Sequence, residues 1–382
     1  MKPPPSTMAG VTETTKDILK RGLSAPICLT WEITYGCNLS CIHCLSASGL
    51  KDPRELTTSQ ALDLLDDFKE MGIFYINIGG GEPTIRRDFL EILRHADSIG
   101  IGVKFSTNGS FIDDGFAREL KGFKYTDVQI SIDGPDRESN DLIRGVGSFD
   151  KALRAMDILQ RSNGIAFKIS VVATRNNVRQ LDLFYELADS YRAELRVTRL
   201  RPSGRGSRVF ADLNPTAEEK IVLYQWLRAH PDVLTGDSFF HLNPLGTPLA
   251  GMNICGAGRV VCLVDPIGNV YACPFTVHET FRAGNISDPG GFREIWDNSE
   301  LFKSLRKVQG PNSCEACVAY QGCQGGCISA KFFTGANLDG PDPDCVLGMA
   351  KPLSQSVEVP LADLSHSRRT RVKIRSNPTR VN

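Results

Sequence analysis

Residues 27–44 read ICLTWEITYGCNLSCIHC, and this stretch decides the fold that we expect. Its first eight residues, 27–34, are rich in apolar and β-branched side chains, so they predict a strand. Cys37, Cys41 and Cys44 follow directly in the loop after this strand. Three thiolates on a four-iron cluster leave one iron open for a further ligand, so the loop indicates chemistry as well as structure.

A repeated strand–helix pattern continues from this first strand to about residue 201. Strands that alternate with helices favour a parallel sheet. Six such units are too few for a closed eight-fold barrel, so we predict an α/β fold with a partial (β/α)6 TIM-like barrel. The active site of such a fold lies at the carboxyl ends of its strands. Further strands are predicted at 75–78, 103–106, 127–132, 167–173 and 194–200, and helices at 58–71, 89–99, 149–161 and 180–191.

Glycines and polar side chains follow the predicted strands at these carboxyl ends. Backbone without Cβ lets a ligand come close, and the carboxylate of Glu82 can accept hydrogen bonds from an ammonium group. The alternative is plain turn chemistry, because Asn-Gly and Asp-Gly are ordinary turn pairs, and Arg144 could equally be a surface arginine. The candidate cofactor-binding residues are Gly80, Gly81, Glu82, Ser106, Asn108, Ser131, Asp133 and Arg144.

Four arginines follow the sixth predicted strand, at the expected mouth of the barrel. They are either a solvated face or an anion-binding rim, because arginine pairs well with carboxylates. We hypothesise that one of them holds the C-terminal carboxylate of a peptide substrate. The four are Arg199, Arg201, Arg205 and Arg208.

A second group of cysteines lies near the end of the chain. Eight thiolates can hold two fully ligated [4Fe–4S] clusters or two zinc ions, and spacing alone does not separate these alternatives. The remaining cysteine, Cys28, lies within the first strand and is interpreted as a small buried thiol. The eight are Cys255, Cys262, Cys273, Cys314, Cys317, Cys323, Cys327 and Cys345.

Composition narrows the class of protein. A formal net charge of zero argues against general binding to nucleic acid or acidic membranes. We find no secretory signal and no transmembrane segment, so the cysteines are interpreted as reduced metal ligands in a cytoplasmic protein. The 382 residues divide into an N-terminal extension (1–24), the partial barrel (25–205), a connector (206–250), a cysteine-rich domain (251–349) and a basic, disordered tail (350–382).

The front loop resembles the C-x3-C-x-Φ-C signature of the radical SAM superfamily, with His43 in place of the usual aromatic residue. A structural zinc site is the alternative, with His43 as a possible fourth ligand. The resemblance implies that Cys37, Cys41 and Cys44 hold the catalytic [4Fe–4S] cluster and that S-adenosylmethionine (SAM) occupies the open iron. It also implies that the Gly-Gly-Glu triplet binds the amino group of SAM and that the other strand-end residues surround its ribose and carboxylate.

The second cysteine group is similar to the SPASM domain of peptide-modifying radical SAM enzymes. By that resemblance two auxiliary clusters are expected, which makes three [4Fe–4S] clusters in all. One auxiliary cluster would take Cys255, Cys262, Cys273 and Cys327, and the other Cys314, Cys317, Cys323 and Cys345.

Longer stretches, among them residues 25–32, 77–84, 236–242 and 255–262, resemble the family of mycofactocin radical SAM maturases. This implies a small ribosomal precursor peptide ending in Val-Tyr, whose tyrosine is oxidatively decarboxylated and then joined to the valine by a carbon–carbon bond. It also implies a separate peptide-recognition protein and an electron donor. The alternatives are another SPASM peptide maturase, which forms a thioether or activates a sulfatase, and a non-catalytic zinc-binding module.

Overall fold

The structure, a computed structural model, describes residues 15–162, 165–236, 238–307, 312–314 and 316–348. The predicted basic tail lies outside the described residues, as does the first half of the predicted N-terminal extension. Residues Thr15–Arg21 of that extension form helix α1. No helix in the described part of the chain is long and apolar enough to cross a membrane.

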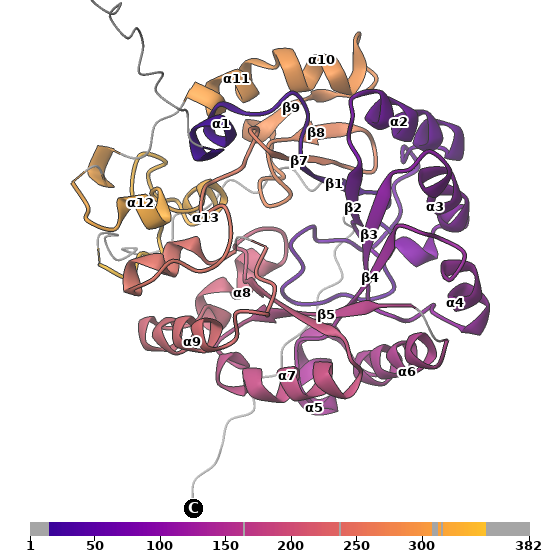
Figure 1. Cartoon of the computed structure of the whole chain (residues 1–382), viewed down its shortest axis with the longest axis horizontal. Helices are drawn as coiled ribbons and strands as arrows, with labels where there is room; N and C mark the ends of the chain where they lie inside the picture. Colours follow the sequence, from indigo (N-terminus) through magenta and orange to yellow (C-terminus); the bar gives the residue numbers. More distant parts are fainter. Residues whose placement is uncertain (1–14, 163–164, 237, 308–311, 315, 349–382) are drawn as a thin grey trace, which may run out of the picture.

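Six parallel strands form the predicted partial barrel, which the structure confirms. Each strand pairs with the next one along the chain, so the sheet order follows the sequence from β6 back to β1. The sheet curves around the interior of the partial barrel (Figure 1). The strands are β1 (Cys28–Glu32), β2 (Tyr75–Gly79), β3 (Gly102–Thr107), β4 (Thr126–Ser131), β5 (Phe167–Ala173) and β6 (Glu194–Arg199).

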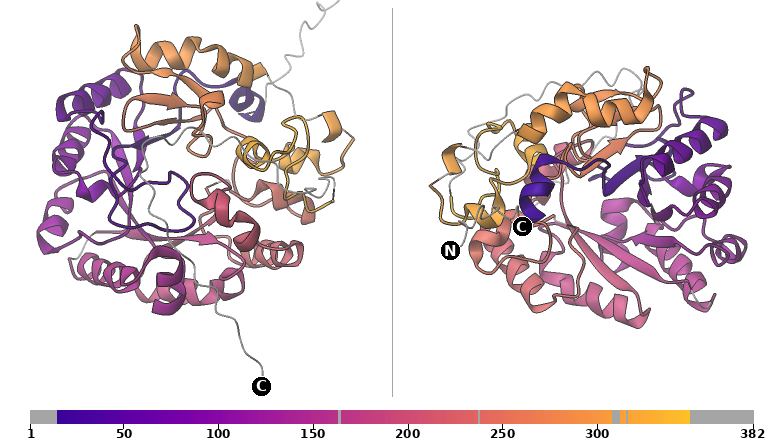
Figure 2. Two further views of the ribbon diagram at one scale, coloured as in Figure 1. Left: turned by 180° about the vertical axis from the view of Figure 1, so that it is seen from behind. Right: turned by 45° about the horizontal axis from the view of Figure 1, so that its top comes forward.

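Helices cover the outer face of this sheet, as Figures 1 and 2 show from opposite sides. The first of them begins with a capping box, in which Thr57 and Gln60 bond to each other's backbone amides. The sequence pattern did not indicate the short helices α4 and α5. The covering helices are α2 (Thr58–Glu70), α3 (Phe89–Ser98), α4 (Asp114–Leu120), α5 (Arg137–Arg144), α6 (Ser148–Arg161) and α7 (Leu181–Ser190).

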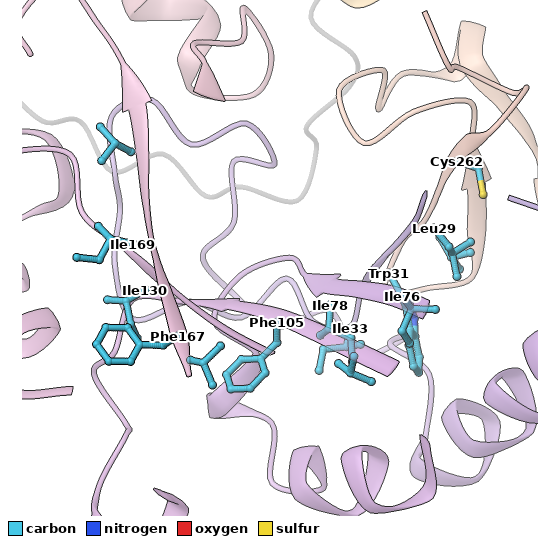
Figure 3. Close-up of a cluster of buried hydrophobic side chains, with 14 of the residues drawn as sticks. Leu29, Trp31, Ile33, Ile76, Ile78, Phe105, Ile130, Phe167, Ile169 and Cys262 are labelled. Atoms are coloured by element: carbon cyan, nitrogen blue, oxygen red, sulfur yellow. The ribbon is translucent and has the colours of Figure 1, made fainter. Parts of the chain in front are cut away.

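Alternation along β1 separates the core from the barrel interior. Leu29 and Trp31 are fully buried and pack between sheet and helices (Figure 3). Thr30 and Glu32 face the other way and line the interior. Because successive side chains of a strand point to opposite faces, the same short strand builds the core and the wall of the site.

Three further strands extend this sheet beyond the six predicted ones. Strand β7 (Val261–Val264) pairs in parallel with β1, and β8 (Asn269–Tyr271) and β9 (Arg282–Asn285) continue antiparallel. The sheet therefore runs through the division predicted at residues 250/251. The cysteine-rich region begins as part of the barrel wall, although its later part is loop-rich. The remaining helices are α8 (Gly206–Leu213), α9 (Ala217–Ala229), α10 (Gly291–Asn298), α11 (Glu300–Lys307), α12 (Tyr320–Cys323) and α13 (Ile328–Phe333).

A buried ion-pair network fastens the C-terminal segment to β6. The guanidinium of Arg199 donates to Asp342 at 2.7 and 3.0 Å and to Asp344 at 2.6 Å. Lys220 on α9 reaches Asp344 at 2.6 Å. Burial opposes the charge of Asp344, but Arg199 and Lys220 lower its pKa to about 2. Asp342 also accepts from the backbone amide of Cys327 at 2.8 Å, so the network positions a cysteine as well.

His241 makes the stability of this network depend on pH. Burial, reinforced by Arg199, lowers the pKa of His241 to about 3 from its ordinary 6.5. The unfolded chain therefore binds the extra proton between those two values, and stability is lost as the pH falls below about 6.5. Acidification from pH 7 to 4.5 should cost about 3 kcal/mol through this residue. Urea unfolding of His241→Phe should show that much less acid destabilisation, whereas an unchanged pH slope would contradict this assignment.

Candidate active site

A cavity of about 1070 Å³ fills the interior of the partial barrel. Its wall includes the front cysteine loop, the inner faces of the strands and segments from the cysteine-rich region. Of the predicted front-site residues, most line it together, although they come from four strand ends. These cavity-lining residues are Cys37, Cys41, Cys44, Gly80, Gly81, Glu82, Ser106, Asn108, Ser131 and Arg144.

The front loop is held in shape by Arg205. Its guanidinium donates to the backbone carbonyls of Cys41 at 2.9 Å and Ser48 at 2.7 Å. The backbone amide of Arg205 donates to the carbonyl of Cys44 at 2.9 Å. These hydrogen bonds hold the loop with its three cysteines at the cavity wall. The guanidinium of Arg205 therefore supports the front loop at the edge of the cavity that it also lines.

The thiols fit a soft metal cluster by their chemistry. Burial raises the pKa of the Cys37 thiol to about 11, and burial also raises that of Cys41. Thiolates at this position are therefore favoured only when a cation compensates their charge, as iron does in a sulfur cluster. Three cysteines at one cavity wall match the three-ligand arrangement predicted from the sequence.

Replacing Arg205 by alanine should loosen the loop. Two charge-assisted hydrogen bonds to the backbone are lost, and we expect a cost of about 2 kcal/mol with a reduced uptake of iron at the front site. Arg208→Ala is the matched control, because that arginine is exposed. Urea unfolding and iron analysis after anaerobic reconstitution measure the two effects. Equal behaviour of both variants would contradict the role of Arg205.

Glu82 is buried, and its carboxylate joins neighbouring strand ends. It accepts from the Thr107 hydroxyl at 2.7 Å and from the Asn108 backbone amide at 2.7 Å, and also from the Thr84 hydroxyl. Asn108 in turn donates to Asn38 of the front loop at 2.9 Å. Glu82 therefore borders the cavity and also fixes the geometry of its rim.

Asp133 needs a correction as a direct cofactor contact. Its side chain is fully buried and, among the described residues, is not part of the cavity wall. One carboxylate oxygen lies 2.7 Å from His43 Nε2 and 2.7 Å from Arg144 Nε. Burial would raise the pKa of Asp133, but Arg144 and His43 hold it well below its usual range. Asp133 is therefore a positioning residue behind His43 and Arg144, which do line the cavity.

The interior below the rim is polar and cationic, which the sequence pattern did not reveal. Arg196 donates to Gln129 at 3.1 Å, and Gln129 donates to Ser106 at 2.9 Å. Lys104 also lines the cavity, and burial lowers its pKa to about 7. The signal was present as polar residues at every second position of β3 to β6, which a core-facing strand would not carry.

The four arginines after β6 separate into different roles. Arg199 belongs to the buried network with Asp342 and Asp344, and Arg205 holds the front loop. Arg208 is exposed. Arg201 lines the cavity, with its guanidinium carbon 4.0 Å from the centre of the Phe275 ring. Arg199 and Arg205 border the same cavity, but their guanidinium groups are held by Asp342 and Asp344 and by the front loop, whereas Arg201 has no carboxylate partner among the described residues.

The cysteines of the cysteine-rich region form one group at the cavity and one group away from it, and Cys262 lies apart from both. Cys255, Cys273 and Cys327 line the cavity. The other set lies away from the cavity in the described structure, where burial and then the neighbouring thiols of Cys345, Cys314 and Cys317 raise the pKa of Cys323. These four are the cysteines predicted for the second auxiliary cluster, and that assignment stays a prediction.

Cys262 is separated from the set predicted for it. It is fully buried in the hydrophobic core beside Leu29, its partner in register on β1 (Figure 3). Its neighbour Val261 lines the cavity instead. Of the expected ligand set Cys255, Cys262, Cys273 and Cys327, three line the cavity, whereas strand alternation turns Cys262 to the opposite face.

Comparisons with known proteins give the class of this chain. Residues 31–188 match the radical SAM superfamily, and residues 255–318 match an iron–sulfur cluster-binding domain, SPASM. The Streptococcus suis protein SuiB, solved bound to S-adenosylmethionine, has a similar fold, with a TM-score of 0.69 at 17% identity over 85% of this chain and 78% of that chain. The structure of native anSMEcpe with bound AdoMet aligns with a TM-score of 0.62 at 21% identity, over 80% of this chain and 90% of that chain.

Curated relatives give the family. Mycofactocin maturase MftC of Mycolicibacterium smegmatis is 56% identical over 92% of this chain and 91% of its own length. The maturase of Mycobacterium ulcerans is 55% identical over 92% of this chain and 96% of its own length. The chain therefore belongs to the mycofactocin maturase family of radical SAM enzymes, which confirms the family resemblance expected from its sequence.

Proposed function

We propose that this chain matures a ribosomal precursor peptide in mycofactocin biosynthesis. It would oxidatively decarboxylate a C-terminal tyrosine and then join that residue to the adjacent valine by a carbon–carbon bond. The family assignment supports this, and one observation carries it. A single cavity is lined on one side by Cys37, Cys41 and Cys44 and elsewhere by cysteines of the C-terminal region. A peptide end inside this cavity therefore borders both cysteine groups.

The residues around the front loop divide the work of binding SAM. When bound, the iron–sulfur cluster and SAM supply a carbon radical that can abstract hydrogen from an unreactive position. The backbone of Gly80 and Gly81 and the carboxylate of Glu82 would hold the amino group. The guanidinium of Arg144, fixed by Asp133, would face the carboxylate. Ser106, Asn108 and Ser131 would contact the remainder of the cofactor.

Three [4Fe–4S] clusters are part of the proposal. The front cysteines would hold one cluster, and Cys255, Cys273 and Cys327 at the cavity wall would hold the second. The third would be held by Cys314, Cys317, Cys323 and Cys345. Oxidative loss of a carboxylate leaves electrons on the substrate that have to be removed. The auxiliary clusters would accept these electrons and carry them away from the substrate. All of these cysteines are free thiols in the described structure.

Arg201 is the residue that we propose for the C-terminal carboxylate of the peptide. It is nine-tenths buried and lines the cavity, and its Nε has no hydrogen-bond partner among the described residues. A carboxylate can fill that unused donor, and buried ion pairs of this kind add orientation. A separate peptide-recognition protein, an electron donor and a cytoplasmic location complete the proposal.

Mass spectrometry of the reaction products tests the proposal. The anaerobically reconstituted protein is incubated with SAM, dithionite and a synthetic precursor peptide ending in Val-Tyr, with the cognate recognition protein added. We expect 5′-deoxyadenosine and a peptide that has lost CO2 and two hydrogens. Cys41→Ala serves as the inactive control. A product that has lost two hydrogens alone would favour thioether chemistry, and a protein that holds zinc without iron would overturn the proposal.

A further inference from the structure

Three cysteine thiols approach the cavity from separate segments of the C-terminal region. Cys255 lies in the loop before β7, Cys273 follows β8, and Cys327 precedes α13. All three line the same cavity, whereas Cys262 does not line it in the described structure.

Cys262 is prevented from joining them by the sheet itself. Strand β7 is bonded on both sides, to β1 in parallel and to β8 antiparallel. A side chain of such a strand changes faces only if the strand slips by one residue, and a slip would turn every side chain of β7 over. Val264, which is fully buried in the core, would then face the cavity.

Cys28 also borders the cavity, but its thiol is directed elsewhere. Its sulfur accepts a hydrogen bond from Asn77 Nδ2 of β2 at 3.5 Å. Strand β2 lies on the opposite side of β1 from β7 and β8. Cys28 therefore leans away from the wall that holds Cys273.

A cation stands next to the three thiols. Arg201 Nη1 donates to Cys327 Sγ at 3.4 Å, while the guanidinium lies over the Phe275 ring. Its buried Nε is left without a partner in the described part of the chain. The position beside the cysteine wall therefore favours an anion.

We propose that this chain supplies only three thiolates to the auxiliary cluster at the cavity wall, from Cys255, Cys273 and Cys327. The fourth iron would then have no thiolate from this chain, and Arg201 beside Cys327 would favour an anionic ligand on it, such as a carboxylate. This inference rests on the proposed function only in requiring an iron–sulfur cluster at these cysteines. It adds a second open iron to the one expected at the front loop.

Iron counting and electron paramagnetic resonance (EPR) on a chain without its front cluster test the inference. The parent is the full chain with Cys37, Cys41 and Cys44 all replaced by alanine, reconstituted anaerobically. It should hold about eight irons per chain, as two [4Fe–4S] clusters require. Adding Cys262→Ala should leave iron, sulfide and the EPR spectrum of the reduced protein unchanged. Adding Cys273→Ala should lower the iron content toward one half. Potassium cyanide should shift the signal of one of the two clusters in the parent and in the Cys262→Ala variant.

The outcomes separate the possible failures. Loss of iron or an altered spectrum in Cys262→Ala would overturn the inference, provided that Cys262→Val, which keeps the core filled, behaves the same way. An unchanged spectrum with cyanide would also overturn it. A changed spectrum in Cys28→Ala would show that this thiol binds the fourth iron, which would overturn the inference. A parent that takes up zinc in place of iron would instead overturn the proposed function.

Discussion

Gly81→Ala is expected to abolish SAM cleavage by this protein. A Cβ at position 81 would lie 2.0 Å from the carbonyl oxygen of Gly36 and 2.9 Å from that of Tyr35. Both of these atoms are backbone, so no side-chain rotation relieves the overlap. The backbone amides of Gly81 and Glu82 also donate to Thr34 and Gly36 at 2.7 and 2.8 Å. The alanine would therefore separate the loop after β2 from the front cysteine loop.

Formation of 5′-deoxyadenosine under strict exclusion of air measures this effect. We expect product below the detection limit together with a lower iron content at the front site. Gly49→Ala is the matched control, because no described atom lies within 4 Å of the added carbon. Gly49 belongs to the same loop and is absent from the cavity wall in the described structure, so its variant should cleave SAM normally. Turnover by Gly81→Ala at the rate of Gly49→Ala would refute the contact between the two loops.

Asp342→Ala is expected to destabilise the folded chain by about 3–5 kcal/mol, the usual cost of leaving a buried charge without its partner. The variant removes two hydrogen bonds from Arg199 and one each from the backbone amides of Cys327 and Asp344. Asp344 alone would remain to compensate the guanidinium of Arg199, whose side chain is only 4% exposed. Because these bonds join β6 to the C-terminal segment, their loss is expected to destabilise both parts of the chain.

Urea unfolding at neutral pH gives the size of this loss. Asp339→Ala is the matched control, since this aspartate is exposed and lies three residues away. It should change the free energy of unfolding by less than about 0.5 kcal/mol, as surface substitutions usually do. A similar small change in Asp342→Ala would show that the network with Arg199 does not hold the C-terminal segment.

The barrel could be predicted from the sequence because each strand carries its own signal. Strand β5 begins and ends at the predicted residues, Phe167 and Ala173, since an apolar run bounded by turn residues marks it. The cysteine loop was predicted from its spacing in the same way. Strand β7 was missed because its residues were interpreted as cysteine spacing and not as an alternating strand. The core-facing position of Cys262 could therefore not be predicted from the cysteine spacing.

The partners of the charged residues could not be predicted, since they are distant in the sequence. Arg199 and Asp342 are 143 positions apart and meet only through the fold. Asp133 was correctly placed at a strand end, but only the packing of the front loop shows that His43 and Arg144 lie between it and the cavity. A strand end indicates that a residue is near the site, and the contacts of its side chain decide whether it touches a ligand.

The pairing of β1 with β7 has a consequence for how the chain folds. Strand β1 is among the first elements to be synthesised, whereas its parallel neighbour begins at Val261. Until that residue has left the ribosome, one edge of β1 remains unpaired and open to other chains. Contacts between such distant segments form slowly. A nascent chain that stops before β7 therefore leaves this edge of β1 without its native neighbour.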